Sequence, residues 1–233
     1  MIIVIEGNIS AGKSTLAKSL ALELDLRLFE EPVVENPYLE DFYKDPCKWA
    51  LTMQLWLLEQ RYKTYREGIA HYKKTGQGVL FDRSVYSDAV FAINSKKCGQ
   101  ISIEGYERYC SKLNECLKEC EIPHFIIYLD VSPEICYRRI HSMRKRACEG
   151  TIPLEYIQSL HLEYLEFLSK MKGQGSVILR INWEEFGSVE SIATLISPKY
   201  RAEITHSLDE SSRMVESKIR HVDIEIEELE IEL

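Results

Sequence analysis

A phosphate-binding loop pattern, GxxxxGK(S/T), occurs near the start of the chain in the segment GNISAGKS, residues 7–14. Residues 1–6 before it form a largely apolar run that is typical of a strand buried on both faces of a parallel sheet. Residues 15–24 after it have the pattern of a helix. A strand, a glycine-containing loop and a helix in this order direct backbone N–H groups at phosphate oxygens, so we expect a bound nucleoside triphosphate.

Two side chains at the end of the loop carry specific chemistry. Lys13 adds a positive charge near the β- and γ-phosphates, and the Ser14 hydroxyl can reach a magnesium ion. An ordinary glycine-containing turn has no need of Lys-Ser at a helix start, which favours the nucleotide site. The residues expected to bind the nucleotide here are Gly7, Asn8, Ile9, Ser10, Ala11, Gly12, Lys13, Ser14 and Thr15.

Length and composition indicate one domain in a reducing environment. The chain has 233 residues, of which 45% are hydrophobic, enough for one sizeable core. Its seven cysteines are an odd number, contain no CxxC pair and follow no signal peptide, so we expect reduced thiols and a cytoplasmic protein. Because no apolar run approaches the ~18 residues of a membrane span, we expect no membrane partner.

The negative charge is concentrated at the carboxyl-terminal end. The net charge of the chain is −8, and residues 221–233 contain six acidic residues and no Lys or Arg. The rest of the chain is therefore nearly neutral, which argues against nucleic-acid binding. Residues 201–233 are interpreted as an acidic tail whose state stays open: disorder, an alternating strand, and a helix with Val222 and Ile226 on one face all fit the pattern.

Strand and helix patterns alternate along residues 1–200. Beyond the first strand, short apolar runs predict four more strands, at residues 26–29, 79–82, 124–129 and 177–181. Helical spacing and capping signals predict helices at residues 49–74, 85–95, 103–120, from 133 onward, and 153–172. This alternation predicts a three-layer α/β domain, in which a five-stranded parallel sheet is flanked by helices and ligands bind beyond the carboxyl ends of the strands.

Polar residues follow two of these strands. Glu31 comes just after the second strand and is expected beside the phosphate loop, where a carboxylate could accept a proton from an attacking hydroxyl. Asp82 and Arg83 stand at the end of the third strand. There, the acid could hold the hydration shell of magnesium, and the arginine could reach the acceptor oxygen or the migrating phosphoryl group. A surface turn and a helix cap are the alternatives for these two segments.

A dense basic run precedes the helix at residues 153–172. It contains Arg138, Arg139, Arg144, Lys145 and Arg146. A charge run of this kind is often a solvated face. In a fold with a phosphate loop, an arginine-rich lid over the triphosphate would neutralise charge on the transferring group and exclude water.

Four motifs together resemble the deoxynucleoside kinase family, which includes the deoxycytidine and deoxyguanosine kinases. They are IEGNISAGKST, EPV, DRSVYSD and RKRACEGTIPLEY, and the resemblance covers residues 1 to about 196. It implies a P-loop kinase fold with an Arg-rich lid, in a kinase domain at residues 1–200. It also implies transfer of a phosphoryl group from ATP, with Mg²⁺, to the 5′-hydroxyl of a deoxynucleoside, in nucleotide salvage and usually by a homodimer.

The resemblance also implies roles for individual residues. Glu31 corresponds to the catalytic base of the family, and Arg83 to the arginine that orients this base and the 5′-oxygen. Tyr43 and Glu149 correspond to the pair that holds the sugar 3′-hydroxyl. The phosphate-binding arginines of the lid correspond to Arg139, Arg144 and Arg146, of which the last two join Lys13 in the expected catalytic set.

Two positions depart from the family pattern. Asp82, which is expected to bind magnesium together with Ser14, stands where close relatives often have Glu, and its side chain has a shorter reach. The lid is one residue longer between Arg139 and Arg144, so that Arg138 is a rival for the role of Arg139.

A third group of residues is expected to recognise the base. Gln54 and Arg61 are two turns apart on the long helix and project from one face, and Asp88 follows the third strand. In the resemblance, these positions correspond to the base-recognition residues of the deoxycytidine and deoxyguanosine kinases. A glutamine amide can form two hydrogen bonds with adenine or cytosine, while a polar wall would face the methyl group of thymine. We therefore expect purine deoxynucleosides or deoxycytidine to be preferred over thymidine; an exposed polar pair is the alternative.

Two other functions share many of these features. A thymidylate kinase would have the same loop, lid and sheet, but it would not need the Glu31 carboxylate to activate a hydroxyl. A non-catalytic assembly subunit could retain the fold, but it would have no need of Lys13 and Arg83. The presence of all three side chains favours a deoxynucleoside kinase.

Overall fold

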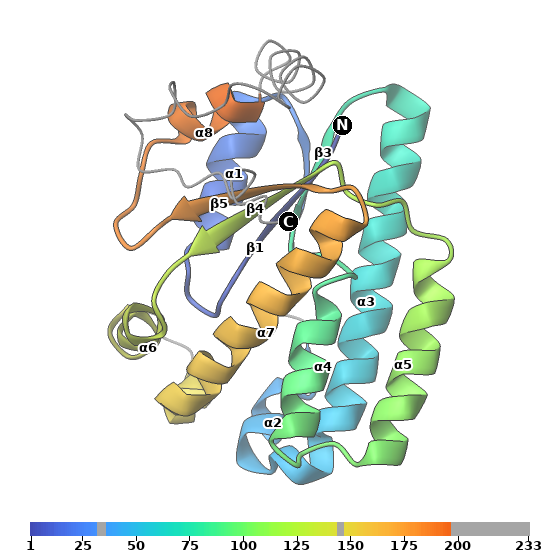
Figure 1. The fold of residues 1–233 in the computed structure, drawn as a ribbon, viewed down its shortest axis with the longest axis vertical. Helices are drawn as coiled ribbons and strands as arrows, with labels where there is room; N and C mark the ends of the chain where they lie inside the picture. The colour runs from blue at the N-terminus through green and yellow to red at the C-terminus, as the bar shows by residue number, and fades with distance from the viewer. Residues whose placement is uncertain (32–35, 144–146, 197–233) are drawn as a thin grey trace, which may run out of the picture.

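Five parallel strands form one sheet in the order β2-β3-β1-β4-β5 (Figure 1). The computed structural model describes residues 1–31, 36–143 and 147–196. The strands are β1 (Ile2–Gly7), β2 (Arg27–Phe29), β3 (Val79–Asp82), β4 (Phe125–Asp130) and β5 (Val177–Asn182). The five-stranded parallel sheet expected from the sequence is confirmed, and every strand lies within one residue of its expected position.

Helices cover both faces of the sheet, which gives the three expected layers (Figure 1). On one face α1 (Lys13–Glu23) packs against α8 (Val189–Ile196). On the other face α4 (Asp88–Lys97) lies between α3 (Pro46–Thr75) and α7 (Leu154–Gly173), and α5 (Ile103–Leu117) packs against α3 and α4. The 3₁₀ helix η1 (Ala147–Thr151) packs against two short helices, α2 (Leu39–Lys44) and α6 (Pro133–Ser142).

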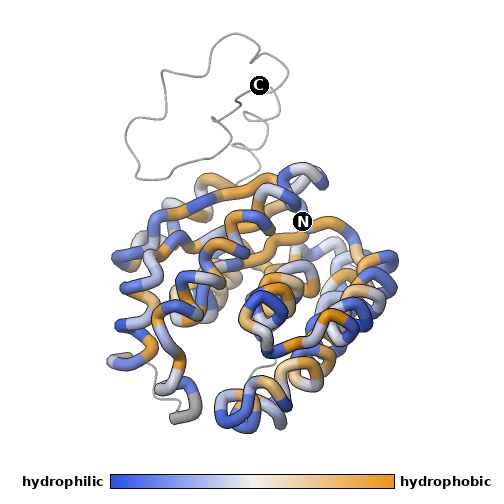
Figure 2. Tube along the Cα trace, turned by 60° about the horizontal axis from the view of Figure 1, so that its bottom comes forward, coloured by the Kyte–Doolittle hydropathy of each residue, from blue (hydrophilic) through white to orange (hydrophobic). Residues whose placement is uncertain are grey.

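The strands form the apolar centre of the domain. Residues 2–5 of β1 are completely buried, and β1 pairs with β3 on one side and with β4 on the other. Because helices cover both faces, the inner strands are continuously apolar and do not alternate. In Figure 2 the strands are mainly hydrophobic, whereas hydrophobic and hydrophilic residues alternate along the helices, as expected for elements with one buried side.

Two helices begin earlier than the sequence pattern predicts, each for a local reason. α1 begins at Lys13 because Gly12 adopts the left-handed conformation, with a φ of 108°, that ends the phosphate loop. α3 begins at Pro46, a residue whose fixed φ suits the first turn of a helix. The side chain of Asp45 caps this helix by accepting a hydrogen bond from the Lys48 N–H at 3.2 Å.

Other differences concern short elements and the ends of helices. The expected helix at residues 85–95 begins only at Asp88, and the helix expected to end at residue 120 ends at Leu117. The sequence patterns did not predict α2, η1 and α8, which are all short. Residues 144–146 and 197–233 lie outside the described residues, as do the expectations for Arg144, Lys145, Arg146 and the acidic tail. Among the described helices, none combines the length and apolar character needed to cross a bilayer.

The contact between α3 and β3 at Gly68 yields a stability prediction. A Cβ atom added to Gly68 would lie 2.2 Å from Cζ of Phe81. The Phe81 ring stacks on Phe29 and Tyr65, with centroid distances of 5.3 and 4.6 Å, and has little room to move. Gly68→Ala is therefore expected to lower the free energy of unfolding by about 1–3 kcal/mol, although alanine favours a helix by roughly 1 kcal/mol. Equilibrium urea unfolding measures the change.

Gly173→Ala provides the matched control. A Cβ atom added to Gly173, at the end of α7, would meet no atom within 4 Å. This variant should be as stable as the native chain or slightly more stable. A Gly68→Ala protein that unfolds at the same urea concentration as Gly173→Ala would show that α3 and β3 pack less closely than described.

Candidate functional site

A cavity of about 620 Å³ lies at the carboxyl end of the sheet, where the loops after β1, β2 and β3 meet. Its walls come from these loops and from α1, α2, α3, α6 and η1, among other segments. The residues expected from the sequence that line it are Ile9, Ser10, Gly12, Lys13, Ser14, Thr15, Glu31, Tyr43, Arg61, Arg83, Arg139 and Glu149. One cavity therefore brings together the groups expected to bind a triphosphate and those expected to bind its acceptor.

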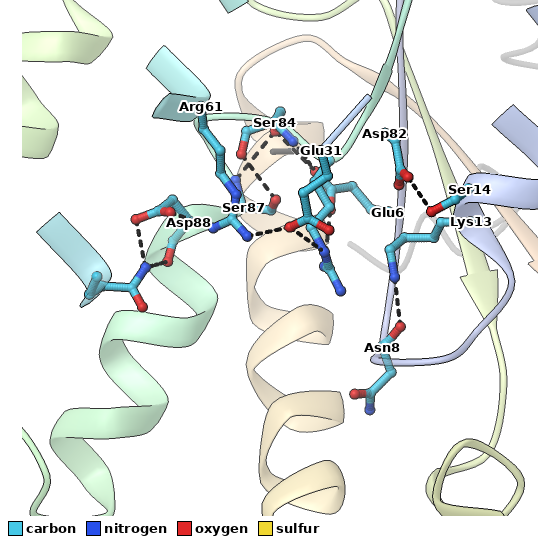
Figure 3. Close-up of polar contacts among 12 residues, drawn as sticks. Glu6, Asn8, Lys13, Ser14, Glu31, Arg61, Asp82, Ser84, Ser87 and Asp88 are labelled. Carbon is cyan, nitrogen blue, oxygen red and sulfur yellow. Dashed lines mark hydrogen bonds and ion pairs between the residues drawn. The ribbon is translucent and has the colours of Figure 1, made fainter. Parts of the chain in front are cut away.

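The phosphate loop has the backbone conformation that a phosphate site requires. Positive φ angles occur at three of its residues, Gly7, Ser10 and Gly12. Such angles allow successive N–H groups to point toward the same space at the start of α1. Lys13 Nζ donates a hydrogen bond to the carbonyl of Asn8 at 2.8 Å (Figure 3). The Asn8 side chain in turn donates to the carbonyl of Ile157 at 2.9 Å, which ties the loop to α7.

Ser14 and Asp82 meet beside the loop (Figure 3). The Ser14 hydroxyl donates a hydrogen bond to Oδ2 of Asp82 at 2.5 Å, so the aspartate reaches Ser14 despite its short side chain. Oδ1 of Asp82 is buried and has no hydrogen-bond partner among the described residues. Burial raises the pKa of this carboxyl group. A buried, unpartnered carboxylate oxygen next to a hydroxyl fits Mg²⁺, which prefers oxygen ligands.

Glu31 is held between two arginines, Arg83 and Arg61, of which Figure 3 labels Arg61. Its Oε1 lies 2.5 Å from Nη2 of Arg61 and 3.2 Å from Nε of Arg83. Burial by itself raises the pKa of Glu31, but the positive charges of Arg83, Arg61 and Lys13 outweigh it and lower the pKa to about 2. The carboxylate is therefore ionised at neutral pH. Because the side chain is 14% exposed, a hydroxyl in the cavity can reach it.

Glu31 shares a cavity with the phosphate loop, although the strands that precede them are not neighbours. β2 pairs with β3, and β3 lies between β2 and β1. Glu31 and Lys13 nevertheless line the same cavity. Arg83, at the end of the intervening strand, lines the same cavity and contacts Glu31 directly.

Arg61 links Glu31 to the group expected to recognise the base. Its Nη1 donates to Oδ1 of Asp88, whose Oδ2 accepts a hydrogen bond from the Tyr109 hydroxyl at 2.6 Å. Nε2 of Gln54 donates to the carbonyl of Asp88 at 3.2 Å and to its Oδ2 at 2.7 Å. The sequence suggested a two-point contact between Gln54 and the base. With both N–H bonds directed at Asp88, only the carbonyl oxygen of Gln54 remains for a ligand.

Tyr43 and Glu149 come from two elements that the sequence pattern did not predict. Tyr43 lies in α2 and Glu149 in η1, and these elements pack against each other. Both side chains line the cavity. The arrangement is compatible with the expected pair at the sugar, and the role itself stays a prediction.

Of the two rival arginines in α6, Arg139 contacts the phosphate loop. Its Nη1 donates to the carbonyl of Ala11 at 3.1 Å, and its Nη2 donates to the carbonyls of Trp183 at 3.0 Å and Glu184 at 2.7 Å. Arg138 is exposed. Arg139 therefore occupies the position next to the loop that the lid anchor needs, although its guanidinium binds backbone carbonyls in this conformation.

Two aromatic residues that the sequence patterns did not single out support the arginines. The ring of Phe91 lies 4.8 Å from the guanidinium of Arg83 and 5.4 Å from that of Arg61. The Tyr164 hydroxyl accepts a hydrogen bond from Nη1 of Arg83. Tyr164 is buried in α7, whereas Phe91 is half-buried in α4 and lines the cavity. No pattern in the sequence distinguishes a ring that packs on an arginine from one that packs on a leucine.

Glu6 is a further residue of the site that the sequence reasoning missed. It is completely buried in β1, just before the phosphate loop. Its Oε1 accepts hydrogen bonds from the N–H and the hydroxyl of Ser84 at 3.1 and 3.0 Å. Burial raises the pKa of Glu6 to about 7, although Arg83 and the hydrogen bonds lower it. The signal that could have revealed it is a lone acid at the end of an apolar run.

Comparison with known proteins identifies close relatives. A family model described as deoxynucleoside kinase matches residues 3–200. A deoxyguanosine kinase of Dictyostelium discoideum is 45% identical over 196 residues, which cover 84% of this chain and 68% of the relative. A deoxyadenosine kinase of the same organism is 39% identical over 200 residues, which cover 86% of this chain and 79% of the relative.

A solved structure shows the same fold. It is the structure of deoxyadenosine kinase from M. mycoides with bound dATP, which matches with a TM-score of 0.72 at 29% identity. The match covers 86% of this chain and 100% of that chain.

The raised pKa of Glu6 predicts a pH-dependent effect of Glu6→Gln on stability. The pKa of this group is about 4.5 in an unfolded chain and about 7 in the fold, so between these values the folded chain retains a proton that the unfolded chain releases. The free energy of unfolding of the native chain therefore falls as the pH rises through this window. Glutamine does not titrate, so the melting temperature of the variant relative to the native chain should rise from about pH 4.5 to about pH 7 and then level off.

Thermal unfolding of both proteins at a series of pH values measures this difference. A difference in melting temperature that stays constant, or that shrinks as the pH rises, would contradict the raised pKa.

Proposed function

This chain belongs to the deoxynucleoside kinase family, and we propose that it transfers a phosphoryl group from ATP to the 5′-hydroxyl of a purine deoxynucleoside or of deoxycytidine in nucleotide salvage. The observation that carries the proposal is the position of Glu31 and Lys13 in one cavity. A carboxylate that can bind a hydroxyl and an ammonium group in a phosphate loop are what the acceptor and the donor of this reaction need.

The phosphate loop and α1 form the donor half of the proposed site. Backbone N–H groups at the start of α1 would bind the β- and γ-phosphates, and Lys13 would balance the charge that develops on the transferred group. Mg²⁺ held by Ser14 and Asp82 would neutralise charge on the phosphate oxygens. The observation that supports this magnesium site is the unpartnered Oδ1 of Asp82, next to the Ser14 hydroxyl.

Glu31 and Arg83 form the acceptor half. Glu31 would accept a hydrogen bond from the 5′-hydroxyl and take up its proton as the oxygen attacks the γ-phosphorus. With a pKa of about 2 in the ligand-free protein, Glu31 is a weak base. Phosphoryl transfer has a loose transition state with little bond formation to the attacking oxygen, so orientation of the hydroxyl matters more than base strength. Arg83, which contacts Glu31, would keep the carboxylate in this orientation.

Tyr43 and Glu149 would bind the sugar. A tyrosine hydroxyl and a carboxylate can together bind a 3′-hydroxyl as donor and acceptor. Both line the cavity that also contains Glu31. A nucleoside anchored by its 3′-hydroxyl at one side and its base at the other would present the 5′-hydroxyl to the catalytic carboxylate.

The group around Asp88 supports the proposed preference for the base. The free carbonyl oxygen of Gln54 can accept a hydrogen bond from the amino group of adenine or cytosine, while Arg61 offers donors to the acceptor atoms of guanine. Thymine would place its methyl group against the charged pair Arg61 and Asp88. This ion pair forms a polar wall, which offers a methyl group no apolar contact.

The remaining parts of the proposal concern the lid, the oligomeric state, the cellular location and the partners. Arg144 and Arg146 would close over the triphosphate from the segment that begins at Arg139. A homodimer in the cytoplasm, without nucleic-acid or membrane partners, fits the nearly neutral charge outside residues 221–233 and the family resemblance. Thymidylate kinase activity and a purely structural role are the two competing functions.

An ADP-release assay with ATP and Mg²⁺ tests the proposed function. The acceptors are deoxyadenosine, deoxyguanosine, deoxycytidine, thymidine and thymidylate. We expect turnover with the first three nucleosides and weaker turnover with thymidine. Turnover with thymidylate alone would identify a nucleotide kinase, and no turnover with any acceptor would favour a structural role.

Glu31→Gln is expected to lower kcat by roughly 10²- to 10⁴-fold, because the amide keeps the shape of the side chain but cannot take up the hydroxyl proton. The dissociation constant of the deoxynucleoside should change little. Glu30→Gln is the matched control, since Glu30 is an exposed neighbour that pairs with Lys18 at 2.7 Å. Glu31 would lose its assignment as the base if its variant kept most of the turnover while the Glu30 variant lost it.

Arg61→Met combined with Asp88→Ala is expected to shift the preference toward thymidine, because the pair removes both charges that would face the thymine methyl group. The measurement is kcat/KM for the four nucleosides in the native and the double-variant enzyme. Thymidine as the best substrate of the native enzyme would contradict the roles of Arg61 and Asp88.

A further inference from the structure

We infer that Glu6 is a positioning residue for the proposed phosphoryl transfer, because it holds the turn that presents Arg83 to Glu31. The inference rests on the proposed function, in which Arg83 orients the catalytic carboxylate. Glu6 itself is completely buried and does not line the cavity. Any effect on catalysis must therefore pass through a neighbouring residue.

The backbone of Arg83 is held in an unfavourable conformation from two sides. Its φ is 68°, in the left-handed region that a residue with a side chain rarely adopts. The Arg83 N–H donates a hydrogen bond to the carbonyl of Ile5 at 3.0 Å. The next N–H, that of Ser84, donates to Oε1 of Glu6 at 3.1 Å. Two consecutive residues of β1 thus bind the two peptide groups that flank Arg83, which is how a strained conformation persists.

The side chain of Arg83 lies between two carboxylates. Its Nε is 3.2 Å from Oε1 of Glu31, and its Nη1 is 3.8 Å from Oε2 of Glu6. Glu31 approaches the guanidinium from the cavity and Glu6 from the buried strand β1. Figure 3 shows Glu6, Glu31 and Ser84 gathered at this point. Glu6 therefore binds the backbone of this turn through Ser84 and also faces the guanidinium of Arg83.

The hydrogen bonds of Glu6 extend to the start of α4. The Ser84 hydroxyl donates to Glu6 and accepts a hydrogen bond from the N–H of Ser87 at 3.3 Å. α4 begins at the next residue, Asp88. A methionine or leucine at position 6 would fill a similar volume without the desolvation cost of a carboxyl group, but it would leave the N–H of Ser84 buried and unpaired. A hydrogen-bond acceptor at position 6 is thus needed for the geometry of the turn, whereas an apolar side chain would satisfy the packing of the strand.

Two substitutions separate hydrogen bonding from packing. Glu6→Met keeps the length of the side chain and removes the acceptor, so we expect kcat to fall by roughly 10- to 100-fold while KM for ATP and for the nucleoside stays within about 3-fold. Glu6→Gln keeps an oxygen that can accept both hydrogen bonds from Ser84, and it should retain kcat within about 3-fold. A Glu6→Met enzyme with native kcat would overturn the inference. So would a Glu6→Met enzyme in which only KM for ATP rises, because that change would indicate an effect through Lys13.

A double-mutant cycle with Arg83→Ala tests the route. If Glu6 acts through Arg83, then Glu6→Met should lower kcat by less than about 2-fold in the Arg83→Ala background. Losses that multiply would show an independent effect of Glu6 and would overturn the inference, while the proposed function stands. An Arg83→Ala enzyme with native turnover would overturn the role of Arg83 and the inference with it.

A second variant covers the case in which Glu6→Met does not fold, as judged by circular dichroism and thermal unfolding. Ser84→Ala removes only the hydroxyl and its link to Ser87, and it then replaces Glu6→Met in the same cycle. We expect it to lower kcat by about 3- to 10-fold in the native background and by less than about 2-fold with Arg83→Ala. Losses that multiply in this cycle would overturn the inference in the same way.

Discussion

Glu31 is bound on two sides by buried guanidinium groups, and this contact joins the elements that surround the cavity. Arg61 lies in α3 and forms a second ion pair with Asp88 at the start of α4. Arg83 follows β3 and faces Glu6 in β1. Buried ion pairs add little net stability, because removing the charges from water costs about as much as the pair gains. Loss of one partner is far more costly, since it leaves a buried charge unpaired. The main effect of this network is therefore to fix the positions of its side chains, and its net contribution to the stability of the fold is small.

Glu31 and Glu6, the two carboxyl groups that face Arg83, have opposite pKa shifts, although the charge of Arg83 lowers the pKa of both. The pKa of Glu31 is lowered to about 2, whereas that of Glu6 is raised to about 7. Glu31 has two arginines within 3.2 Å, and their charges outweigh the cost of burial. Glu6 lies 3.8 Å from Arg83, and burial outweighs the effects of Arg83, of Lys13 and of the hydrogen bonds that Glu6 accepts. Glu31 is thus kept ionised by its two arginines, whereas burial favours the protonated form of Glu6.

The apolar sheet makes this concentration of buried charge possible. The strands supply a continuous part of the buried hydrophobic core, and the polar loops of the cavity lie where the parallel strands end. Because all five strands point the same way, residues far apart in the sequence meet at one edge. Phosphoryl transfer depends on positioning and on charge stabilisation in a space with little water, and such an edge provides both.

Local patterns in the sequence were sufficient for the phosphate loop, the five strands, and the strand-end residues Glu31, Asp82 and Arg83. Each of these depends on a short segment: a glycine spacing, an apolar run, or a polar residue directly after one. The motif resemblance added Tyr43, Glu149 and the base-recognition group, but it could not orient their side chains. The sequence patterns did not predict the short helices α2, η1 and α8, because a few residues do not establish a helical period.

Only the tertiary structure decided which side chains pair. Strand order placed β3 between β1 and β2, and the long-range contacts that set this order leave no signal in either strand. In α6, Arg139 contacts the phosphate loop and Arg138 is exposed, and Asp88 accepts both hydrogen bonds that the Gln54 amide donates. The link from Glu6 to Arg83 depends on the hydrogen bond between Glu6 and Ser84, which are 78 positions apart in the chain. The burial of a charged side chain and the identity of its partners depend on all the elements that pack around it. They therefore could not be predicted from the segment that contains the residue.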